Sequence, residues 1–328
     1  MSLVDPYHRK IDYLRISVTD RCNLHCIYCV PQGDIPKLKH EEILRYEEIL
    51  RLANIAISLG IKKIRVTGGE PLVRKDIIHL LEALSSLDGV KDLAITTNGV
   101  LLKDKLNDIW NAGIRRLNIS LDSLKRDRFK IITGSDKLND VLEAIEMAED
   151  LGFEPIKLNM VVMKDINDDE IEAFASLSFE RPYHVRFIEY MPIGSRPGHL
   201  TPGYIPAKEI KKRLEKIGRL ERVLRGRYDG PAERFRFNGA QGEIGFISPM
   251  TNHFCDTCNR LRLTAKGHLR PCLLCNRELD VKTALRSGAS DEELAELFRR
   301  AVSSKPKAHP LAEQEFSQFP GEMSIIGG

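Results

Sequence analysis

An alternation of short strand-like runs with amphipathic helical stretches, from residue 11 to about residue 220, most constrains how this chain of 328 residues folds. Six strand-like runs cover residues 13–19, 63–67, 93–97, 116–121, 155–162 and 184–190. Between them lie helical stretches such as residues 41–59, 76–87 and 138–151, in which Leu, Ile and Ala recur every three or four positions. Six β/α units in succession imply a parallel α/β sheet with right-handed crossovers. A closed barrel of this kind has about eight strands. We therefore expect an open, incomplete (three-quarter) β/α barrel of the TIM type.

The strand-like runs carry polar residues on one face and apolar residues on the other. In the first run Arg15, Ser17 and Thr19 alternate with Leu14, Ile16 and Val18. The same alternation adds the polar residues Lys63, Arg65, Thr67, Thr96, Asn98, Asn118, Ser120, Asp122, Lys157 and Asn159. The outer face of a β/α barrel packs under helices and must be apolar, so the polar set points inward. A purely structural barrel fills its interior with Val, Ile and Leu, whereas this interior is polar and cationic, as a ligand site requires.

The character of the sequence changes after about residue 218. Glycines and arginines become frequent, which indicates turns and short strands, including residues 234–237 and 243–248. Two helices are expected at about residues 281–285 and 291–302. We therefore predict a barrel domain over residues 1–220 and a smaller C-terminal α+β domain over residues 221–328.

Composition favours an enzyme of the cytoplasm. The chain is 42% hydrophobic, which allows a large core, and no stretch approaches the roughly 18 apolar residues of a membrane span. Residues 1–10 are charged and lack the apolar run of a signal peptide. The net charge of +3 gives no whole-protein argument for nucleic acid. Any anion site must therefore be built locally from Lys and Arg.

Three cysteines near the start, Cys22, Cys26 and Cys29, lie in the motif R-C-N-L-H-C-I-Y-C. A 4Fe-4S cube has four irons that each need a ligand, so three thiolates leave one iron open. A structural zinc site would need four closed ligands, and the nearest candidate fourth, His25, lies inside the same tight loop. The C-x3-C-x2-C spacing resembles the radical S-adenosylmethionine (SAM) superfamily. The resemblance implies that SAM binds the open iron and is cleaved to a 5′-deoxyadenosyl radical.

The segment T-G-G-E-P, residues 67–71, directly follows the second strand-like run. Alone it is a weak signal, because most such loops are only turns. Beside the cysteine motif it resembles the loop that binds the SAM amino group in this superfamily. The resemblance implies a backbone contact from Gly69 and a carboxylate acceptor at Glu70, with further SAM contacts from Tyr28, Ser120 and Met191.

A second cysteine set, Cys255, Cys258 and Cys272, has the spacing C-x2-C-x13-C and is followed by N-R-L-R-L-T. With L-R-I-S-V-T-D-R-C-N, I-R-V-T-G-G-E-P-L, T-T-N-G, N-I-S-L-D-S, R-F-I-E-Y-M and a terminal Gly-Gly, the chain resembles one radical SAM family over nearly its whole length. Members of that family act on GTP in the first step of molybdenum-cofactor biosynthesis. The resemblance implies a second 4Fe-4S cluster on these cysteines, whose open iron anchors the purine. Cys275 departs from the family and extends the pattern toward a zinc ribbon, although we favour three ligands.

The resemblance also assigns the substrate contacts. A triphosphate brings about four negative charges into a partly enclosed cavity, so several fixed cations are required. The implied GTP contacts are Arg15, Arg65, Thr96, Lys157, Arg260 and Arg262, with Lys63 and Arg186 as cations behind them. Arg15 and the tail glycines Gly327 and Gly328 are the implied catalytic residues. By itself the tail would be interpreted as a frayed terminus.

The implied partners are GTP, an electron donor such as flavodoxin, and the cyclic pyranopterin monophosphate synthase that takes up the product. The oligomeric state stays open, with a homodimer as one outcome. Two alternatives remain. A peptide-modifying radical SAM enzyme with auxiliary clusters would usually carry more C-terminal cysteines. A zinc-ribbon protein that binds nucleic acid would contain zinc without sulfide and bind with a steep salt dependence.

Overall fold

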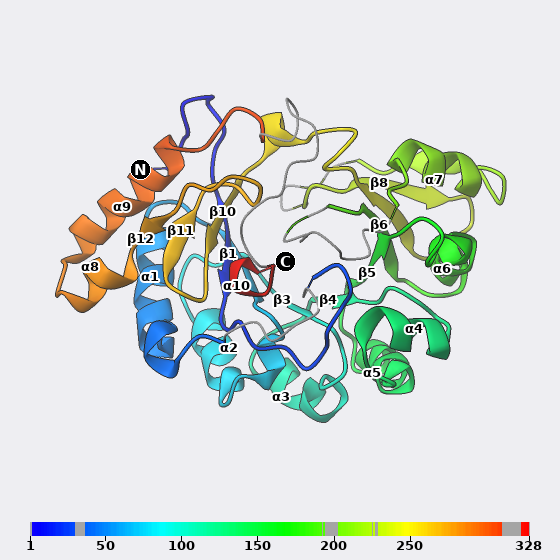
Figure 1. Cartoon of the computed structure of the whole chain (residues 1–328), viewed down its shortest axis with the longest axis horizontal. Helices are drawn as coiled ribbons and strands as arrows, with labels where there is room; N and C mark the ends of the chain where they lie inside the picture. Colours follow the sequence, from blue (N-terminus) through cyan, green and yellow to red (C-terminus); the bar gives the residue numbers. More distant parts are fainter. Residues whose placement is uncertain are drawn as a thin grey trace.

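A single sheet of twelve strands runs through the described part of the chain (Figure 1). The computed structural model describes residues 2–29, 37–191, 193, 203–224, 226, 229–309 and 323–327. The strand order across the sheet is β12-β11-β10-β1-β2-β3-β4-β5-β6-β9-β8-β7. The strands are β1 (Tyr13–Ser17), β2 (Lys63–Thr67), β3 (Asp92–Thr97), β4 (Leu117–Ser120), β5 (Ile156–Val162), β6 (His184–Glu189), β7 (Leu220–Arg222), β8 (Glu233–Phe237), β9 (Glu243–Ile247), β10 (Arg260–Leu263), β11 (His268–Arg270) and β12 (Leu279–Asp280).

The six expected strands β1 to β6 are confirmed as consecutive parallel neighbours. The structure adds a parallel strand at each edge, because β10 pairs with β1 and β9 pairs with β6. No pairing between β10 and β9 occurs among the described residues, so the sheet stays open there. The incomplete β/α barrel is therefore confirmed. The strand expected at residues 243–248 is present as β9 but pairs with the barrel sheet, and β10 was not expected.

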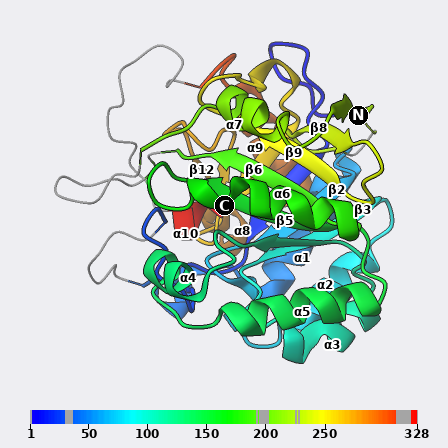
Figure 2. The same ribbon diagram turned by 90° about the vertical axis from the view of Figure 1, so that its right-hand side faces the viewer.

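The helices lie mainly outside the parallel strands, as Figure 2 shows for α5 and α6 beside β5 and β6. They are α1 (Tyr46–Ser58), α2 (Ile77–Ser85), α3 (Leu106–Asn111), α4 (Arg126–Thr133), α5 (Leu138–Asp150), α6 (Ile171–Glu180), α7 (Ala207–Leu214), α8 (Lys282–Arg286), α9 (Asp291–Ser303) and α10 (Met323–Ile326). Short 3-10 turns cover His40–Glu42, Pro71–Val73, Lys103–Lys105, Asp168–Glu170 and Cys255–Thr257.

The helix expected over residues 41–59 begins later, at Tyr46. The backbone at Ile43 is extended, and the Leu44 amide donates to the carbonyl of Ala265 at 3.1 Å. The Glu48 carboxylate then accepts from the Arg45 amide at 2.6 Å and caps the start of α1. A contact with the C-terminal part of the chain thus overrides the local helical pattern.

The strand faces divide as the alternation predicted. Leu14, Ile16, Ile64 and Val66 are fully buried in one hydrophobic core with α1 and α2. The alternate residues of the same strands face the other way, into the barrel interior. Polar and cationic side chains are thereby left on the face opposite α1 and α2.

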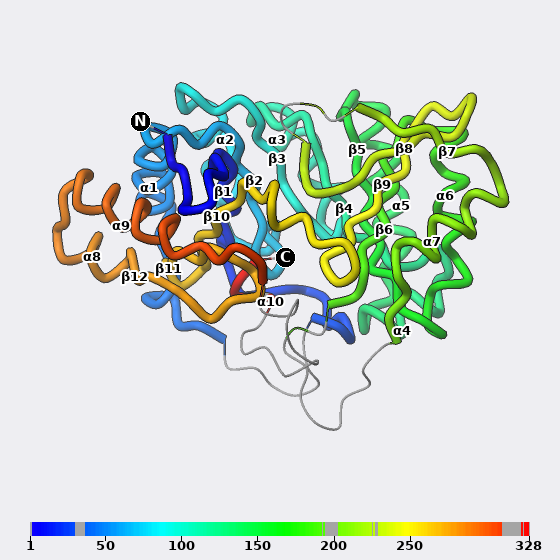
Figure 3. The backbone as a smooth tube through the Cα atoms, turned by 90° about the horizontal axis from the view of Figure 1, so that it is seen from above, coloured from blue at the N-terminus to red at the C-terminus, as the bar shows by residue number. Residues whose placement is uncertain are grey.

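The chain end returns to the middle of the molecule. The carbonyl of Ile325 in α10 accepts from the Ala265 amide, just after β10, at 3.3 Å. Figures 1 and 3 both show α10 and the C-terminus near the centre, between the β10 side and the β6 side of the sheet. The C-terminal segment therefore supplies strands to both edges and an end to the interior, while the division at residue 220 stays a prediction.

Because β10 is built into the sheet, truncating its core side chain should destabilise the whole fold. Leu263 is fully buried and pairs in register with Ile16. We expect Leu263→Ala to lower the free energy of unfolding by about 2–5 kcal/mol. Urea unfolding followed by circular dichroism measures this, with the exposed Leu224→Ala as control. An early unfolding transition that leaves most of the circular dichroism signal intact would contradict this expectation.

Candidate functional site

Both cysteine sets line one cavity on the inner face of the sheet. Its walls include Cys22, Cys26, Cys29, Cys255, Cys258 and Cys272. The cysteines come from the loop after β1 and from the turns that flank β10 and β11. Since β10 and β1 are adjacent strands, the structure brings together two motifs that lie more than 200 residues apart.

The first cysteine loop is held from two sides. The His25 amide donates to the carbonyl of Thr133 and the Ile27 amide donates to that of Ile132, both at 2.9 Å, so the end of α4 carries the loop. On the other side the Asn98 side-chain amide, after β3, approaches Cys22 Sγ at 3.7 Å. Burial raises the pKa of the Cys22 and Cys26 thiols. A positive metal centre would offset that cost, because it favours the thiolate form.

The T-G-G-E-P loop packs its backbone against the start of the cysteine loop. The Gly69 amide donates to the Thr19 carbonyl at 2.7 Å, and the Glu70 amide donates to the Arg21 carbonyl at 2.8 Å. A Cβ on Gly69 would lie 2.3 Å from the Arg21 carbonyl oxygen. Gly69 is therefore needed for a close approach of two backbone segments.

The Glu70 carboxylate already accepts three hydrogen bonds from the protein. It accepts from the amides of Leu72 at 3.0 Å and Asn98 at 2.7 Å and from the Thr97 hydroxyl at 2.8 Å. The side chain is 1% exposed, and burial raises its pKa to about 7. A carboxylate has about four acceptor positions, so a ligand amine could still approach. The observed contacts show that Glu70 also fixes the β2 and β3 loops.

The second cysteine set lies on a 3-10 turn and two strand ends. Cys255 opens the turn, Cys258 ends it and leads into β10, and Cys272 follows β11. Burial opposes ionisation of Cys258, but Arg260 and Lys305 lower its thiol pKa to about 6. A hydrogen bond from the Cys275 thiol lowers the pKa of Cys272 to about 5. The surroundings of Cys258 and Cys272 thus favour thiolates, the form that binds iron, whereas burial raises the pKa of Cys255.

Cys275 is buried and is not among the described residues that line the cavity. Its thiol approaches the Cys272 carbonyl at 3.6 Å. Across the described ranges, no three His, Cys, Asp or Glu side chains converge on a single ion position. A zinc site gathers its ligands on one ion, whereas a cube spreads them over different irons. The Cys275 thiol also contacts the Cys272 thiol, and the three-ligand interpretation stays a prediction.

Cations lie opposite one another across the neighbouring strands. In register, Arg262 of β10 is beside Arg15 of β1, which is beside Arg65 of β2. Like charges on facing strand positions repel each other. The cavity walls hold Arg15, Lys63, Arg65, Lys157, Arg186, Arg260, Arg262 and Lys305, against the carboxylates of Glu70 and Asp122. This excess of positive charge fits a polyanionic ligand.

The mutual repulsion appears in the ionisation of individual groups. Burial, followed by Arg186, Arg116 and Arg65, lowers the pKa of Lys157 to about 5. Burial and Arg65 lower that of Arg186 to about 10. Burial opposes ionisation of Tyr13, yet the cations around it lower its hydroxyl pKa to about 7. Tyr13 therefore lies among these cations, and the sequence had not indicated a role for it.

Several buried polar atoms on these walls have no hydrogen-bond partner within the described protein. They are Arg65 Nε, Asn118 Oδ1, Asn159 Oδ1 and His309 Nδ1. A buried polar group without a partner is costly, so water or a ligand in the cavity is expected to satisfy these atoms. Six thiols, eight cations and these atoms therefore fit two clusters, SAM and a nucleotide polyphosphate.

The remaining predicted residues also reach the cavity. Thr96, Ser120 and Met191 line it, as does Tyr28, whose hydroxyl donates to Asp122 at 2.6 Å. Lys305 and His309 also line the cavity, although the sequence had not predicted them as site residues. Nothing in their local sequence indicates a site, because residues 299–309 look like a basic helix end and linker.

The tail enters the same region. The Arg262 guanidinium donates to the Gly327 carbonyl. Gly327 has a φ of 83°, and a Cβ there would lie 2.8 Å from Thr67 Cγ2 and 3.0 Å from Ser17 Cβ. The chain end is therefore seated at the carboxyl ends of β1 and β2, where only glycine fits. Gly328 lies outside the described residues.

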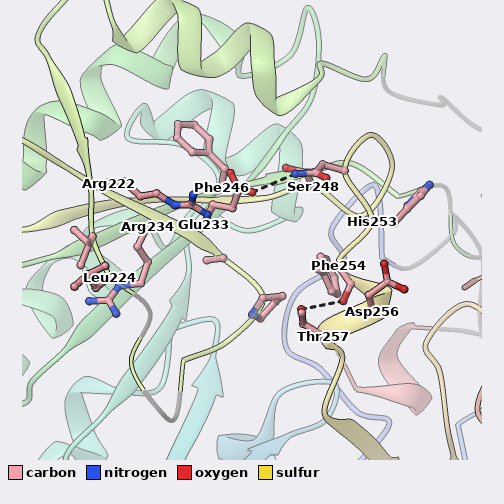
Figure 4. Close-up of a pocket in the computed structure, with 14 residues that line it drawn as sticks. Arg222, Leu224, Glu233, Arg234, Phe246, Ser248, His253, Phe254, Asp256 and Thr257 are labelled. Atoms are coloured by element: carbon pink, nitrogen blue, oxygen red, sulfur yellow. Dashed lines mark hydrogen bonds between the residues drawn. The ribbon is translucent and has the colours of Figure 1, made fainter. Parts of the chain in front are cut away.

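A second cavity, of about 530 Å³, lies beside the first (Figure 4). Figure 4 shows Arg234 and Glu233 of β8 on one side and the turn from Phe254 to Thr257 on the other. The two cavities share Pro231 and Phe254. No cysteine occurs among the described residues of this second cavity, so the metal chemistry belongs to the first.

Comparison with known proteins agrees with this geometry. The Radical SAM superfamily matches residues 16–177, and the family Molybdenum Cofactor Synthesis C matches residues 183–311. The chain is 51% identical to a GTP 3′,8-cyclase of Thermodesulfovibrio yellowstonii, over 99% of both chains. It is 49% identical to a GTP 3′,8-cyclase of Moorella thermoacetica, again over 99% of both chains. These relatives share its full length.

The structural comparison supports the fold. The SuiB protein of Streptococcus suis bound to S-adenosylmethionine matches with a TM-score of 0.62 at 15% identity, over 89% of this chain and 69% of that one. At this identity the likeness shows only the fold, which is that of radical SAM proteins. Within the described residues, no helix combines the length and apolar character needed to cross a membrane.

Removing the buried Lys157 amine should stabilise the ligand-free protein at neutral pH. Its folded pKa of about 5 lies below the ordinary value of 10.5, so at pH 7 the unfolded state holds a proton that the folded state lacks. The resulting penalty grows as pH falls from about 10.5 toward 5, by at most about 1.4 kcal/mol per unit.

We therefore expect Lys157→Met to raise the free energy of unfolding at pH 7 and the gain to shrink toward pH 10. Urea unfolding at several pH values measures it, with the exposed Lys91→Met as control. If the free energy of unfolding depends on pH equally in Lys157→Met and in the wild type, the expectation is contradicted.

Proposed function

Because this chain belongs to the GTP 3′,8-cyclase family, we propose that it converts GTP to (8S)-3′,8-cyclo-7,8-dihydroguanosine 5′-triphosphate. This is the first step of molybdenum-cofactor biosynthesis. One observation carries the proposal. A single cavity is lined by both cysteine triads and by the row of arginines on the adjacent strands β10, β1 and β2. The arrangement supports a site in which each triad would hold one cluster and the cations would hold a polyphosphate.

The first triad, Cys22, Cys26 and Cys29, holds the cluster that binds SAM. Tyr28, Gly69, Glu70, Ser120 and Met191 surround SAM; all of them line the cavity. When bound, this cluster and SAM would supply the radical chemistry that converts GTP to the 3′,8-cyclised product. The protein's part is to hold C3′ within reach, since a misplacement of about 1 Å can cost ~100-fold in rate.

The second triad, Cys255, Cys258 and Cys272, would hold the cluster that supplies an open iron to anchor the purine. The row of Arg262, Arg15 and Arg65 takes the triphosphate and ribose, with Arg260, Lys157 and Thr96 beside it. Each charge-assisted hydrogen bond contributes about 1.5–3 kcal/mol. The bound anion also relieves the repulsion within the row, so GTP and the cations stabilise each other.

Arg15 lies at the centre of this row and contacts the Tyr13 hydroxyl at 3.4 Å. Here it orients the ribose, while Gly327 lies beside Arg262. Gly328 stays a predicted catalytic residue. A closed cavity keeps water and oxygen from the radical. No side chain has to act as an acid or base in the hydrogen abstraction.

The proposal extends to the surroundings of the enzyme. It acts in the cytoplasm, receives its electron from a donor such as flavodoxin, and passes its product to cyclic pyranopterin monophosphate synthase. A homodimer is one assembly compatible with this role. Gel filtration with light scattering measures the oligomeric state.

Cluster content and GTP-dependent chemistry test the proposal directly. Anaerobic reconstitution should give about eight irons per chain, because each cube holds four. The loaded enzyme should cleave SAM to 5′-deoxyadenosine only when GTP is present, with 3′,8-cyclo-GTP detected by mass spectrometry. Four irons with one zinc would instead make Cys275 a ligand and remove the second cluster. SAM cleavage that a peptide triggers but GTP does not would identify a peptide-modifying enzyme.

The tail supplies a separate prediction. Gly327→Ala places a Cβ against Thr67 and Ser17 in a left-handed backbone position. We expect this variant combined with Gly328→Ala, and deletion of both glycines, to abolish 3′,8-cyclo-GTP formation while iron content and thermal stability stay near wild type. Gly288→Ala, at a positive-φ turn with open space around it, is the control for glycine substitution in general. Full activity in the truncated protein would show that the tail has no catalytic role.

A further inference from the structure

The second cysteine set has little secondary structure of its own to hold it. Cys255 and Cys258 bound a three-residue 3-10 turn, and Cys272 lies in the turn after the three-residue strand β11. A cube needs three thiolates at fixed separations. Something outside these turns must therefore hold them together.

Arg9 makes the first connection. Its side chain is 6% exposed, and its Nη1 donates to the Cys255 carbonyl at 2.7 Å across 246 residues of sequence. The same guanidinium donates to the carbonyls of Lys307 at 2.9 Å and Pro306 at 2.6 Å. One buried cation thus fixes Cys255 to the segment after α9, and Figure 1 shows the blue N-terminal hairpin beside that segment.

The N-terminal hairpin is shaped to present this arginine. The Ile11 amide donates to the Leu3 carbonyl at 2.9 Å, and the Asp5 amide donates to the Arg9 carbonyl at 3.1 Å. The Asp5 carboxylate accepts from the amides of Tyr7 and Arg9 and contacts Arg9 Nε at 2.5 Å. Asp5 therefore neutralises Arg9 and aims its other donors at the cysteine turn.

Lys305 makes the second connection. It is 4% exposed, and its Nζ donates to the Arg260 carbonyl at 2.8 Å and to the Pro271 carbonyl at 2.5 Å. Arg260 follows Cys258 by two residues, and Pro271 directly precedes Cys272. Lys305 also immediately precedes the two residues whose carbonyls Arg9 holds. The two cations thus tie all three cysteine segments to residues 305–307.

We propose that Arg9 and Lys305 are positioning residues for the second cluster, and that the N-terminal hairpin is part of its cradle. Through the carbonyls beside Cys255, Cys258 and Cys272 they hold the three thiolates at the separations that a cube requires. This rests on the proposed function, which places a cluster on these cysteines. Partners outside the ligand set commonly tune metal affinity in this way.

The test isolates the second cluster. The full-length chain with Cys22→Ala, Cys26→Ala and Cys29→Ala is reconstituted anaerobically, so that its iron and sulfide report only the second site. Arg9→Met and Lys305→Met are added separately. Arg51→Met is the matched control, because Arg51 also joins a carboxylate and a carbonyl, those of Asp291 and Ala289, but lies on α1.

We expect loss of iron to a chelator to be about tenfold or more faster in Arg9→Met and Lys305→Met, with an altered electron paramagnetic resonance spectrum of the reduced cluster. Arg9→Lys should recover part of the retention, because it keeps the charge and loses the forked contacts. Arg51→Met should match the parent chain.

Three results would overturn the proposal. Parental retention and an unchanged spectrum in both variants would show that the contacts do not position the cluster. The same loss of the first cluster, in a chain with Cys255→Ala, Cys258→Ala and Cys272→Ala, would show that the two residues only stabilise the fold. A parent chain that binds no iron at all would instead remove the second cluster, and the proposed function would fail with it.

Discussion

The cations on the inner face of the sheet are the constraint on which the rest of the structure depends. Parallel pairing places Arg262, Arg15 and Arg65 side by side, and all three line the cavity. Their repulsion works against folding, and the apolar outer faces of the same strands must compensate. The low pKa of Lys157 records the same conflict. The cationic face lowers the free energy of the protein only when a polyanion binds to it.

Much of this was predictable from the sequence because strand alternation has a strict period of two. The inward set of β1 to β5 was derived from polar and apolar positions alone, and the six strand ranges agree with the structure to within two residues. The cysteine spacings identified the metal chemistry for a different reason. Cys22, Cys26 and Cys29 are so close in sequence that they remain close in any fold, whereas Cys272 joins the second set only through the fold.

The rest depended on pairings that no local pattern reveals. The strand β10 carries the same alternation as β1, yet only the register shows that Arg262 faces Arg15. The Glu70 carboxylate was expected to await a ligand amine, and its observed contacts with Leu72, Thr97 and Asn98 come from loop geometry. Arg9 and Lys305 look like ordinary charged residues near chain segments without motifs. Their partners are backbone carbonyls, which every residue has.

The position of β10 explains why one chain end must serve the whole cavity. By pairing with β1, β10 brings the second cysteine set beside the first strand of the barrel, and Ala265 just beyond it binds α10. The tail therefore reaches Ser17 and Thr67 only because β10 lies where it does. The Gly327 carbonyl brings a partial negative charge to Arg262, in the row that otherwise repels itself. Tail, second cysteine set and cation row are thus consequences of a single strand pairing, and a change in any one of them alters the electrostatics of the other two.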